Sequence, residues 1–172
     1  TTLNPIFNRL MSRVVPYVYQ KFDLAAVRPD KDAIQVVLTT PDHALNTIQP
    51  GLNLFDPKHH LSTHSPAVEE VLRELERRES KGLDRDGKAM LDHFQAPPYG
   101  WHPEVIRLLI AAIFRGGVLT VKSGNVTYDD ATVPAAQDKL IKANDFKNAV
   151  FIYEAEETTS LADRQRAQSA LS

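Results

Sequence analysis

The stretch from Leu91 to Asp130 constrains the fold of this chain most, because a helix rich in aliphatic residues leads there directly into a glycine-punctuated hairpin. After Pro103 the apolar residues recur at helical spacing, and the pair Gly116-Gly117 is typical of a helix end. Residues 118–128 then give two β-branched runs separated by a Ser-Gly-Asn turn. A helix followed at once by a hairpin is the second half of a winged helix.

Two further helical patterns precede this one and complete the expected unit. Ser65 is a candidate N-cap for a helix that runs to about Glu79, and a shorter helix is expected over 86–94. We therefore predict a mainly helical α+β fold with a winged-helix-like domain over 65–130. Its core is expected to form around four apolar side chains, namely Val71, Leu91, Ile106 and Ile113.

The flanking segments are assigned to two smaller units. Residues 1–64 are expected to form an N-terminal helical and connector segment, in which a helix beginning at Pro5 bends or ends at Pro16. The run 32–40 fits a strand or a short helix. Residues 131–172 are expected to form a C-terminal packing extension. In that extension the patterns predict a helix over 135–143, a strand over 150–153 and a polar helix over 160–171.

Composition removes several classes of function. With 42 % hydrophobic and 24 % charged residues the chain is of ordinary globular type, and its net charge of −2 does not favour nucleic acid or an anionic membrane. The absence of cysteine excludes disulfides, thiolate metal sites and cysteine nucleophiles. No apolar run approaches the roughly 20 residues of a membrane span, so we expect a cytoplasmic protein without a membrane partner. Because the sequence begins without methionine and stops inside a helical pattern, we also expect an excised piece of a longer polypeptide.

A second motif carries a family resemblance. The Pro-Pro-Tyr-Gly-Trp turn at 97–101, the helix after it with Gly116-Gly117, and the earlier segment Gly51 to Asp56 are similar to a non-catalytic, winged-helix-like region of large P-loop ATPases. Those ATPases belong to BREX-type bacteriophage-resistance systems. The resemblance implies a domain of a bacterial defence ATPase, but this chain has no G-x-x-x-x-G-K-[ST] loop. We therefore expect no enzyme activity and no cofactor in this piece, with ATP hydrolysis elsewhere in its parent.

The predicted nucleic-acid-binding residues are Arg107, Arg115 and Lys122. Helical spacing places the two arginines on the side of the third helix opposite its aliphatic residues, together with Glu104 and Ala111, while Lys122 lies on the wing. Over 66–130 nine basic residues face eleven acidic ones, so three cations would bind double-stranded DNA only weakly. The alternative is a protein-interaction scaffold without nucleic-acid contact. Its partners would be other domains of the parent ATPase or other subunits of the defence system.

Two other groups of side chains have simpler interpretations. His59, His60 and His64 are the densest cluster of metal-ligand type, but they lie in a polar loop where exposed histidines are common, so we assign no metal. A small metallohydrolase built on this loop is the third, least favoured function. Tyr99 and Trp101 are expected to pack over the helical core. His93 and His102, which flank the same turn, are expected to act as capping or hydrogen-bonding groups.

Overall fold

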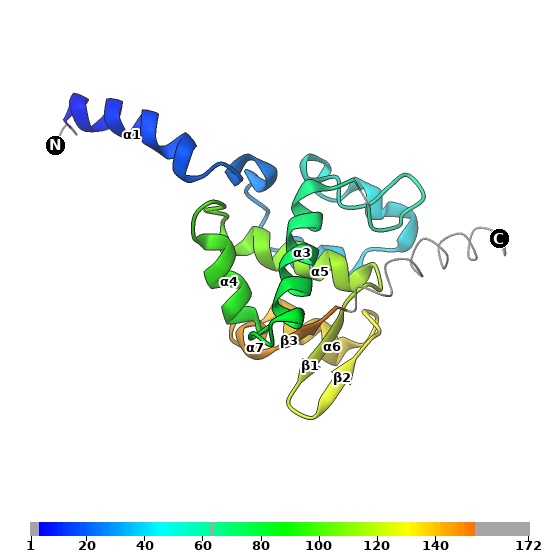
Figure 1. The fold of residues 1–172 in the computed structure, drawn as a ribbon. Helices are drawn as coiled ribbons and strands as arrows, with labels where there is room; N and C mark the ends of the chain where they lie inside the picture. The colour runs from blue at the N-terminus through cyan, green and yellow to red at the C-terminus, as the bar shows by residue number, and fades with distance from the viewer. Residues whose placement is uncertain (1–3, 63, 154–172) are drawn as a thin grey trace.

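The computed structural model describes residues 4–62 and 64–153, which form a mainly helical α+β fold (Figure 1). The predicted fold class is confirmed. The α-helices are α1 (Pro5–Val18), α2 (Ala33–Thr39), α3 (Pro66–Ser80), α4 (Gly87–Gln95), α5 (Pro103–Arg115), α6 (Pro134–Ile141) and α7 (Ala143–Asn148). Short 3-10 helices lie at Phe22–Ala25, Asp42–Thr47 and Pro50–Leu52, and the strands are β1 (Thr120–Ser123), β2 (Val126–Tyr128) and β3 (Val150–Ile152).

Helices α3, α4 and α5 followed by the β1–β2 hairpin form the predicted winged helix. Helix α5 has the expected bounds, and it ends before Gly117, whose φ of 76° is readily adopted only by glycine. Strands β1 and β2 pair antiparallel with Val121 opposite Tyr128. The predicted two-stranded ribbon after Gly116-Gly117 is therefore confirmed.

The expected strand near residue 150 is also present and adds a third strand to the wing. Strand β3 pairs antiparallel with the other edge of β1, where Phe151 lies opposite Val121, so the sheet order is β2-β1-β3. The Phe151 N–H also donates to the carbonyl of Arg85 at 3.0 Å. The connection between α3 and α4 is thereby attached to the same sheet.

One hydrophobic core runs through the described residues from Ala25 to Tyr153. The four side chains predicted at its centre, Val71, Leu91, Ile106 and Ile113, are all buried. Residues from both flanking segments enter the same core, among them Val37 of α2 and Phe146 of α7. The core therefore continues across both predicted unit boundaries, between residues 64 and 65 and between residues 130 and 131. The division of the chain into three units stays a prediction.

The turn between α4 and α5 packs as expected against the helices. The Trp101 ring stacks on Phe94 with ring centroids 4.9 Å apart, and Tyr99 meets both rings edge-on. The Trp101 indole N–H donates to the Lys21 carbonyl at 2.9 Å, which ties the segment after α1 to this turn. Close to the same place, Gly100 approaches the Tyr19 ring so tightly that a Cβ at Gly100 would lie 2.6 Å from it.

Two glutamates of α3 depart from the sequence prediction. The acidic and basic residues of this helix alternate in sign, which predicts a solvated outer face with ion pairs one turn apart, such as Glu74 with Arg78. That pair is confirmed, but Glu70 and Glu74 are buried rather than solvated. Glu70 accepts hydrogen bonds from the Tyr99 hydroxyl at 2.6 Å and from Lys21 Nζ at 2.9 Å. Glu74 accepts from Arg77 and Arg78. The exposure predicted for these two residues was wrong, because Tyr99 of the aromatic turn lies against Glu70 and His93 of α4 lies against Glu74.

The environment of these carboxylates changes their proton affinity. Burial raises the pKa of Glu70, but the hydrogen bonds from Tyr99 and Lys21 outweigh it and hold that pKa below its ordinary value. At Glu74 burial acts in the same direction and is again outweighed, here by Arg77, His93 and Arg78, so its pKa is also lowered. Burial lowers the pKa of His93, which lies with its Nε2 3.5 Å from Glu74.

Three local predictions about segment ends need correction. Helix α1 continues through Pro16 to Val18, because the missing N–H falls in the last turn, where the helix loses a single hydrogen bond. Ser65 occupies the predicted N-cap position of α3, but its side chain accepts no hydrogen bond from the helix, and its hydroxyl donates to the Leu52 carbonyl at 2.7 Å. The helix expected over 135–143 is divided into α6 and α7 at Lys142. The run 32–40 holds helix α2, whereas the helix predicted over 160–171 lies outside the described residues.

We predict that acid destabilises the fold through these carboxylates. Because their pKa values are lower in the folded than in the unfolded chain, their contribution is complete above about pH 4.5 and is lost as the pH falls through the folded values. Denaturant unfolding across a pH series should show this loss. In Glu74→Gln the free energy of unfolding should depend less on pH than in the wild type. In Glu76→Gln, on the exposed side of α3, it should depend on pH as in the wild type. If the free energy of unfolding depends on pH equally in the wild type and both variants, Glu74 is not a source of the acid destabilisation.

A second prediction concerns the packing of α4 on α7. A Cβ on Gly87 would lie 1.9 Å from the backbone oxygen of Phe146, so Gly87→Ala should lower the free energy of unfolding by about 3 kcal/mol. Gly51→Ala is the matched control, because its new methyl group would meet only Val27 at an ordinary 3.5 Å. Chemical denaturation of both variants measures the difference. A Gly87→Ala protein as stable as the control would show that the contact is not tight.

Candidate nucleic-acid interface

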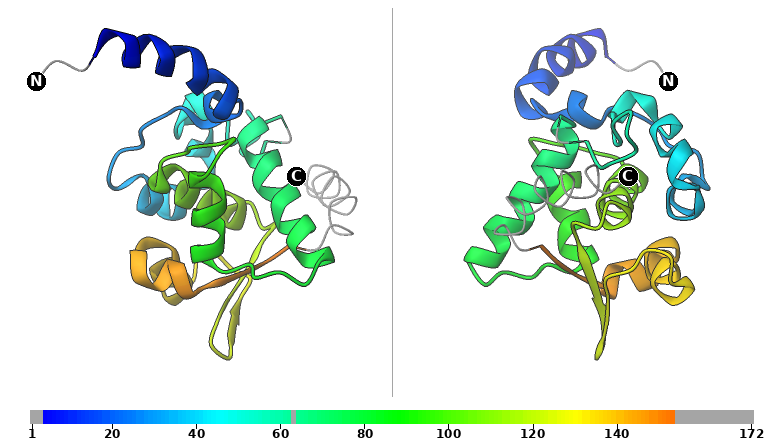
Figure 2. Two further views of the ribbon diagram at one scale, coloured as in Figure 1. Left: turned by 60° about the vertical axis from the view of Figure 1, so that its left-hand side comes forward. Right: turned by 90° about the vertical axis from the view of Figure 1, so that its right-hand side faces the viewer.

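Helix α5, the helix that would enter a DNA groove in a winged helix, is enclosed by the rest of the protein. Every residue from Val105 to Phe114 is buried, and α2, α3 and α4 all pack against this helix (Figure 2). The predicted exposed stripe on α5 is therefore wrong, since Ala111 is fully buried and Arg107 is only 7 % exposed. Helix α2 covers the side of α5 that the sequence pattern left open.

Arg107 connects α5 to the C-terminal end of α6. Its guanidinium donates to the backbone carbonyls of Leu140 and Ile141 and pairs with Glu104 at 2.9 Å. The guanidinium also lies 5.5 Å from the centroid of the Phe146 ring. The last carbonyls of a helix lack partners within it and carry partial negative charge, so a buried cation there stabilises the docking of α6.

Arg115, at the C-terminal end of α5, likewise binds backbone and side-chain groups of a neighbouring segment. Its Nη2 donates to the Thr40 carbonyl at 3.0 Å and to the Asp42 carboxylate, and 12 % of its side chain is exposed. Thr40 directly follows α2. The residue therefore fixes the end of α2 to the end of α5, and its guanidinium is turned towards protein partners.

Of the three predicted nucleic-acid-binding residues, Lys122 alone is exposed. It lies on β1, in a hairpin that projects from the body of the molecule (Figure 1). Asn125 in the turn is exposed as well, and the acidic pair Asp129 and Asp130 follows β2. The structure does not bring the three cations to one surface, and contact of any of them with DNA stays a prediction.

The histidine loop is organised by a carboxylate. Asp56 Oδ1 accepts the backbone N–H groups of Lys58 and His60, and the loop is closed by an antiparallel bridge between Phe55 and Leu61. Within residues 4–62 and 64–153, no three His, Asp or Glu side chains are placed so that they could hold a metal ion. His102 acts as the predicted capping group, since its Nδ1 accepts the Glu104 N–H at 3.2 Å.

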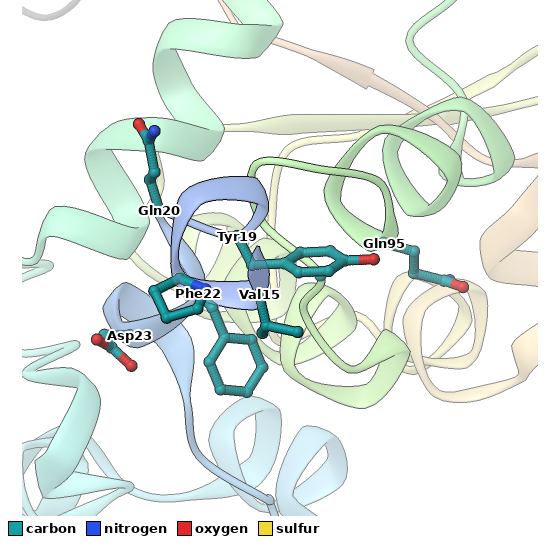
Figure 3. A pocket seen from close by; sticks show the side chains of 8 residues that line it. Val15, Tyr19, Gln20, Phe22, Asp23 and Gln95 are labelled. Carbon is teal, nitrogen blue, oxygen red and sulfur yellow. The ribbon is translucent and has the colours of Figure 1, made fainter. Parts of the chain in front are cut away.

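A pocket at the base of α1 was missed by the sequence analysis. It has a volume of about 450 Å³, its apolar wall is formed by Val15, Tyr19 and Phe22, and Asp23 lies at its edge (Figure 3). Its polar lining groups are this one carboxylate, the Tyr19 hydroxyl and the amides of Gln20 and Gln95, and the apolar wall suits the binding of apolar side chains. The signal in the sequence was the long apolar stripe of the helix that begins at Pro5, to which no function was given.

None of the helices in the described ranges combines the length and the apolar character that a bilayer crossing requires. This holds for α1 and α5 as well, the two described helices with the most apolar side chains.

The structural role of Arg107 gives a testable prediction. Arg107→Met keeps the apolar stem but leaves two backbone carbonyls of α6 without a donor, so the free energy of unfolding should fall by about 2 kcal/mol. Lys122→Met, which also replaces a cation but at an exposed position, should change it by less than about 0.5 kcal/mol. Urea unfolding measures both values. An Arg107→Met protein with wild-type stability would contradict the structural role.

Comparison with known proteins supplies the family. The family model described as the winged helix-turn-helix domain of the BREX ATP-binding protein BrxC matches residues 42–156. Neither the curated proteins nor the solved structures contain a match to this chain. The matched residues include α3, α4, α5, the wing and β3, which are the elements that build the winged helix. The chain therefore belongs to the family of winged helix-turn-helix domains of the BREX ATP-binding protein BrxC, a subunit of a phage-resistance system.

Proposed function

We propose that this domain is an assembly module of the BREX ATP-binding protein, which holds that subunit to another protein surface and does not read DNA through α5. The burial of α5 is the single observation that supports this proposal most strongly. Exposing the helix would require α2 and α6 to leave it. That movement would break the contacts of Arg107 and Arg115 and expose an apolar surface.

Charge supports the same proposal. Each phosphate contact requires a cation at the surface, and affinity for DNA rises with the number of such contacts. The segment 66–130 carries a net charge of −2, and the guanidinium groups of Arg107 and Arg115 are already paired with carboxylates. On the hairpin this leaves Lys122, which is too little charge for stable binding at physiological salt.

A second candidate function is DNA contact through the wing alone. The observation in its favour is the projection of the β1–β2 hairpin (Figure 2). Lys122 on β1 and Asn125 in the turn are both exposed. A hairpin of this kind can reach a groove or the phosphate backbone. Such contact would add to an assembly role only if other domains of the ATP-binding protein supply most of the binding energy.

We further propose that the domain is not catalytic and that ATP is handled elsewhere in the ATP-binding protein. The chain has no phosphate-binding G-x-x-x-x-G-K-[ST] loop. The pocket at the base of α1 has a mainly apolar wall with one carboxylate, Asp23, at its edge, which suits binding better than catalysis.

We predict that the isolated chain binds DNA weakly or not at all. Titration of a fluorescently labelled 30-base-pair duplex at 50 and 200 mM salt should give no dissociation constant below about 10 μM at the higher salt. Lys122→Glu should behave like the wild type in the same assay, because one cation contributes little. Submicromolar binding at 200 mM salt that Lys122→Glu abolishes would overturn the proposal in favour of the wing.

The assembly role itself is tested by co-purification. The domain should form a stable complex on size exclusion with the remaining part of the BREX ATP-binding protein or with another purified BREX subunit. Glu76→Ala, an exposed change on α3, serves as a surface control that keeps the fold. Failure to form a complex with every one of these proteins would contradict the assembly role.

A further inference from the structure

The pocket at the base of α1 holds a carboxylate that has no partner in the described part of the chain. Asp23 lies at the edge of the pocket, and among residues 4–62 and 64–153 none donates a hydrogen bond to its carboxylate or pairs with it. The eight residues that line the pocket include no lysine, arginine or histidine (Figure 3). The lining therefore carries a negative charge that it does not neutralise itself.

The C-terminal end of α1 adds to this negative charge. Val15 and Pro16 in the last turn and Tyr19 at the C-cap all line the pocket. The last carbonyls of a helix lack partners within it and carry partial negative charge, so a cation is favoured beside them. The last turn of α1 contains no basic residue that could take this place. A helix end and a carboxylate thus act in the same direction on whatever enters the pocket.

The wall of the pocket suits an organic cation better than a metal ion. A metal ion requires several oxygen ligands around it, whereas aromatic rings attract an organic cation and cover its apolar stem. The rings of Tyr19 and Phe22 belong to the wall, together with the Val15 side chain (Figure 3). The volume of about 450 Å³ leaves room for one long side chain, and Phe22 is 44 % exposed.

This wall is held in place by the body of the protein. The Tyr19 ring packs so closely on Gly100 that a Cβ there would lie 2.6 Å from it. The Lys21 N–H donates to the Pro98 carbonyl at 3.0 Å, and the Phe22 N–H donates to the Tyr19 carbonyl at 3.1 Å. Because these contacts already order the backbone around the pocket, a ligand loses little free energy in ordering it on binding.

We propose that this pocket binds an arginine side chain of the protein with which the domain assembles. The inference rests on the proposed assembly role and supplies the chemistry of its contact. Arginine fits better than lysine, because its planar guanidinium stacks on aromatic rings and its five N–H donors can reach several acceptors. The available acceptors are the Asp23 carboxylate, the Tyr19 hydroxyl and the side-chain oxygens of Gln20 and Gln95.

A blocked arginine tests the pocket itself. The probe is N-acetylarginine N-methylamide, added to the 172-residue chain while the backbone amide signals are followed by NMR. The signals of Gln20, Asp23 and Gly100 should shift and saturate with a dissociation constant of about 1 to 10 mM, as expected for one side chain. N-acetylcitrulline N-methylamide keeps the shape but has no charge, so it should bind roughly 10-fold more weakly. The corresponding lysine probe should also bind more weakly than arginine.

Two substitutions separate the carboxylate from the aromatic wall. Asp23→Asn should weaken binding of the arginine probe about 10-fold, because a charge-assisted contact is lost without a change of shape. Phe22→Leu should weaken it about 3-fold, because one ring face is lost. Asp30→Asn makes the same chemical change at an exposed carboxylate outside the pocket and should bind the probe like the wild type. All three side chains are exposed, so the far-ultraviolet spectrum should not change.

A protein complex tests the source of the arginine. The complex of the domain with the remaining part of the BREX ATP-binding protein, or with another BREX subunit, should be weakened by Asp23→Asn but not by Asp30→Asn. The blocked arginine at about 50 mM should compete with this complex, whereas the blocked citrulline should not.

Other outcomes would overturn the proposal or separate it from the assembly role. Equal binding of the arginine and citrulline probes overturns it, and so does arginine binding that Asp23→Asn leaves unchanged. Tighter binding of spermidine than of the arginine probe overturns it in favour of a small polyamine. A dimer of this chain that Asp23→Asn dissociates overturns it in favour of a second copy.

The two proposals can fail separately. A complex that forms but does not respond to Asp23→Asn overturns this inference while the assembly role stands. A chain that binds the arginine probe but forms no complex contradicts the assembly role, while the preference of the pocket for arginine stands.

Discussion

Burial of helix α5 is the constraint on which the other described elements depend. Ten consecutive residues of this helix, Val105 to Phe114, are removed from solvent, and a helix that is apolar on every side has to be covered on every side. Helices α2, α3 and α4 pack around it, and α6 is attached through Arg107. The two arginines act at opposite ends of the helix. Arg107 holds the end of α6, and Arg115 holds the end of α2.

This arrangement separates the winged-helix architecture from the way such a fold commonly meets DNA. The order of helices and the hairpin follow the pattern of the family, but the third helix lies inside and its cations serve neighbouring backbone carbonyls. The covering helix α2 precedes the matched region 42–156, so the enclosure depends partly on residues outside the family model. What the described surface offers instead is the uncovered apolar face of α1 and the pocket beside it.

The segment that carries α1 is fixed to the body at one place. The Trp101 indole reaches the Lys21 carbonyl, Lys21 reaches Glu70, and the Tyr99 hydroxyl completes the same set. These hydrogen bonds, two of which are charge-assisted at the buried Glu70 carboxylate, hold the base of α1 against the aromatic turn and α3. The exposed helix α1 is therefore attached to the body through the residues that follow it.

The sequence by itself determined the order of elements in the winged helix. The bounds of α5, the glycine end at Gly117, the hairpin, the four core side chains and the packing of Tyr99 and Trp101 all follow from local patterns, because caps, turns and periodicity act over a few residues. The family also followed from the sequence, through the turn at 97–101.

Only the tertiary structure decided which face of α5 is open and what its arginines do. Helical spacing gives the side of α5 on which Arg107 lies, but not that α2 and α6 arrive there from positions far apart in the chain. The same reason applies to Glu70, whose partners Lys21 and Tyr99 lie 49 and 29 residues away, and to the stripe of α1, which a local pattern cannot distinguish from a core face. Burial is a property of the packed chain, because it depends on which distant segment covers a surface.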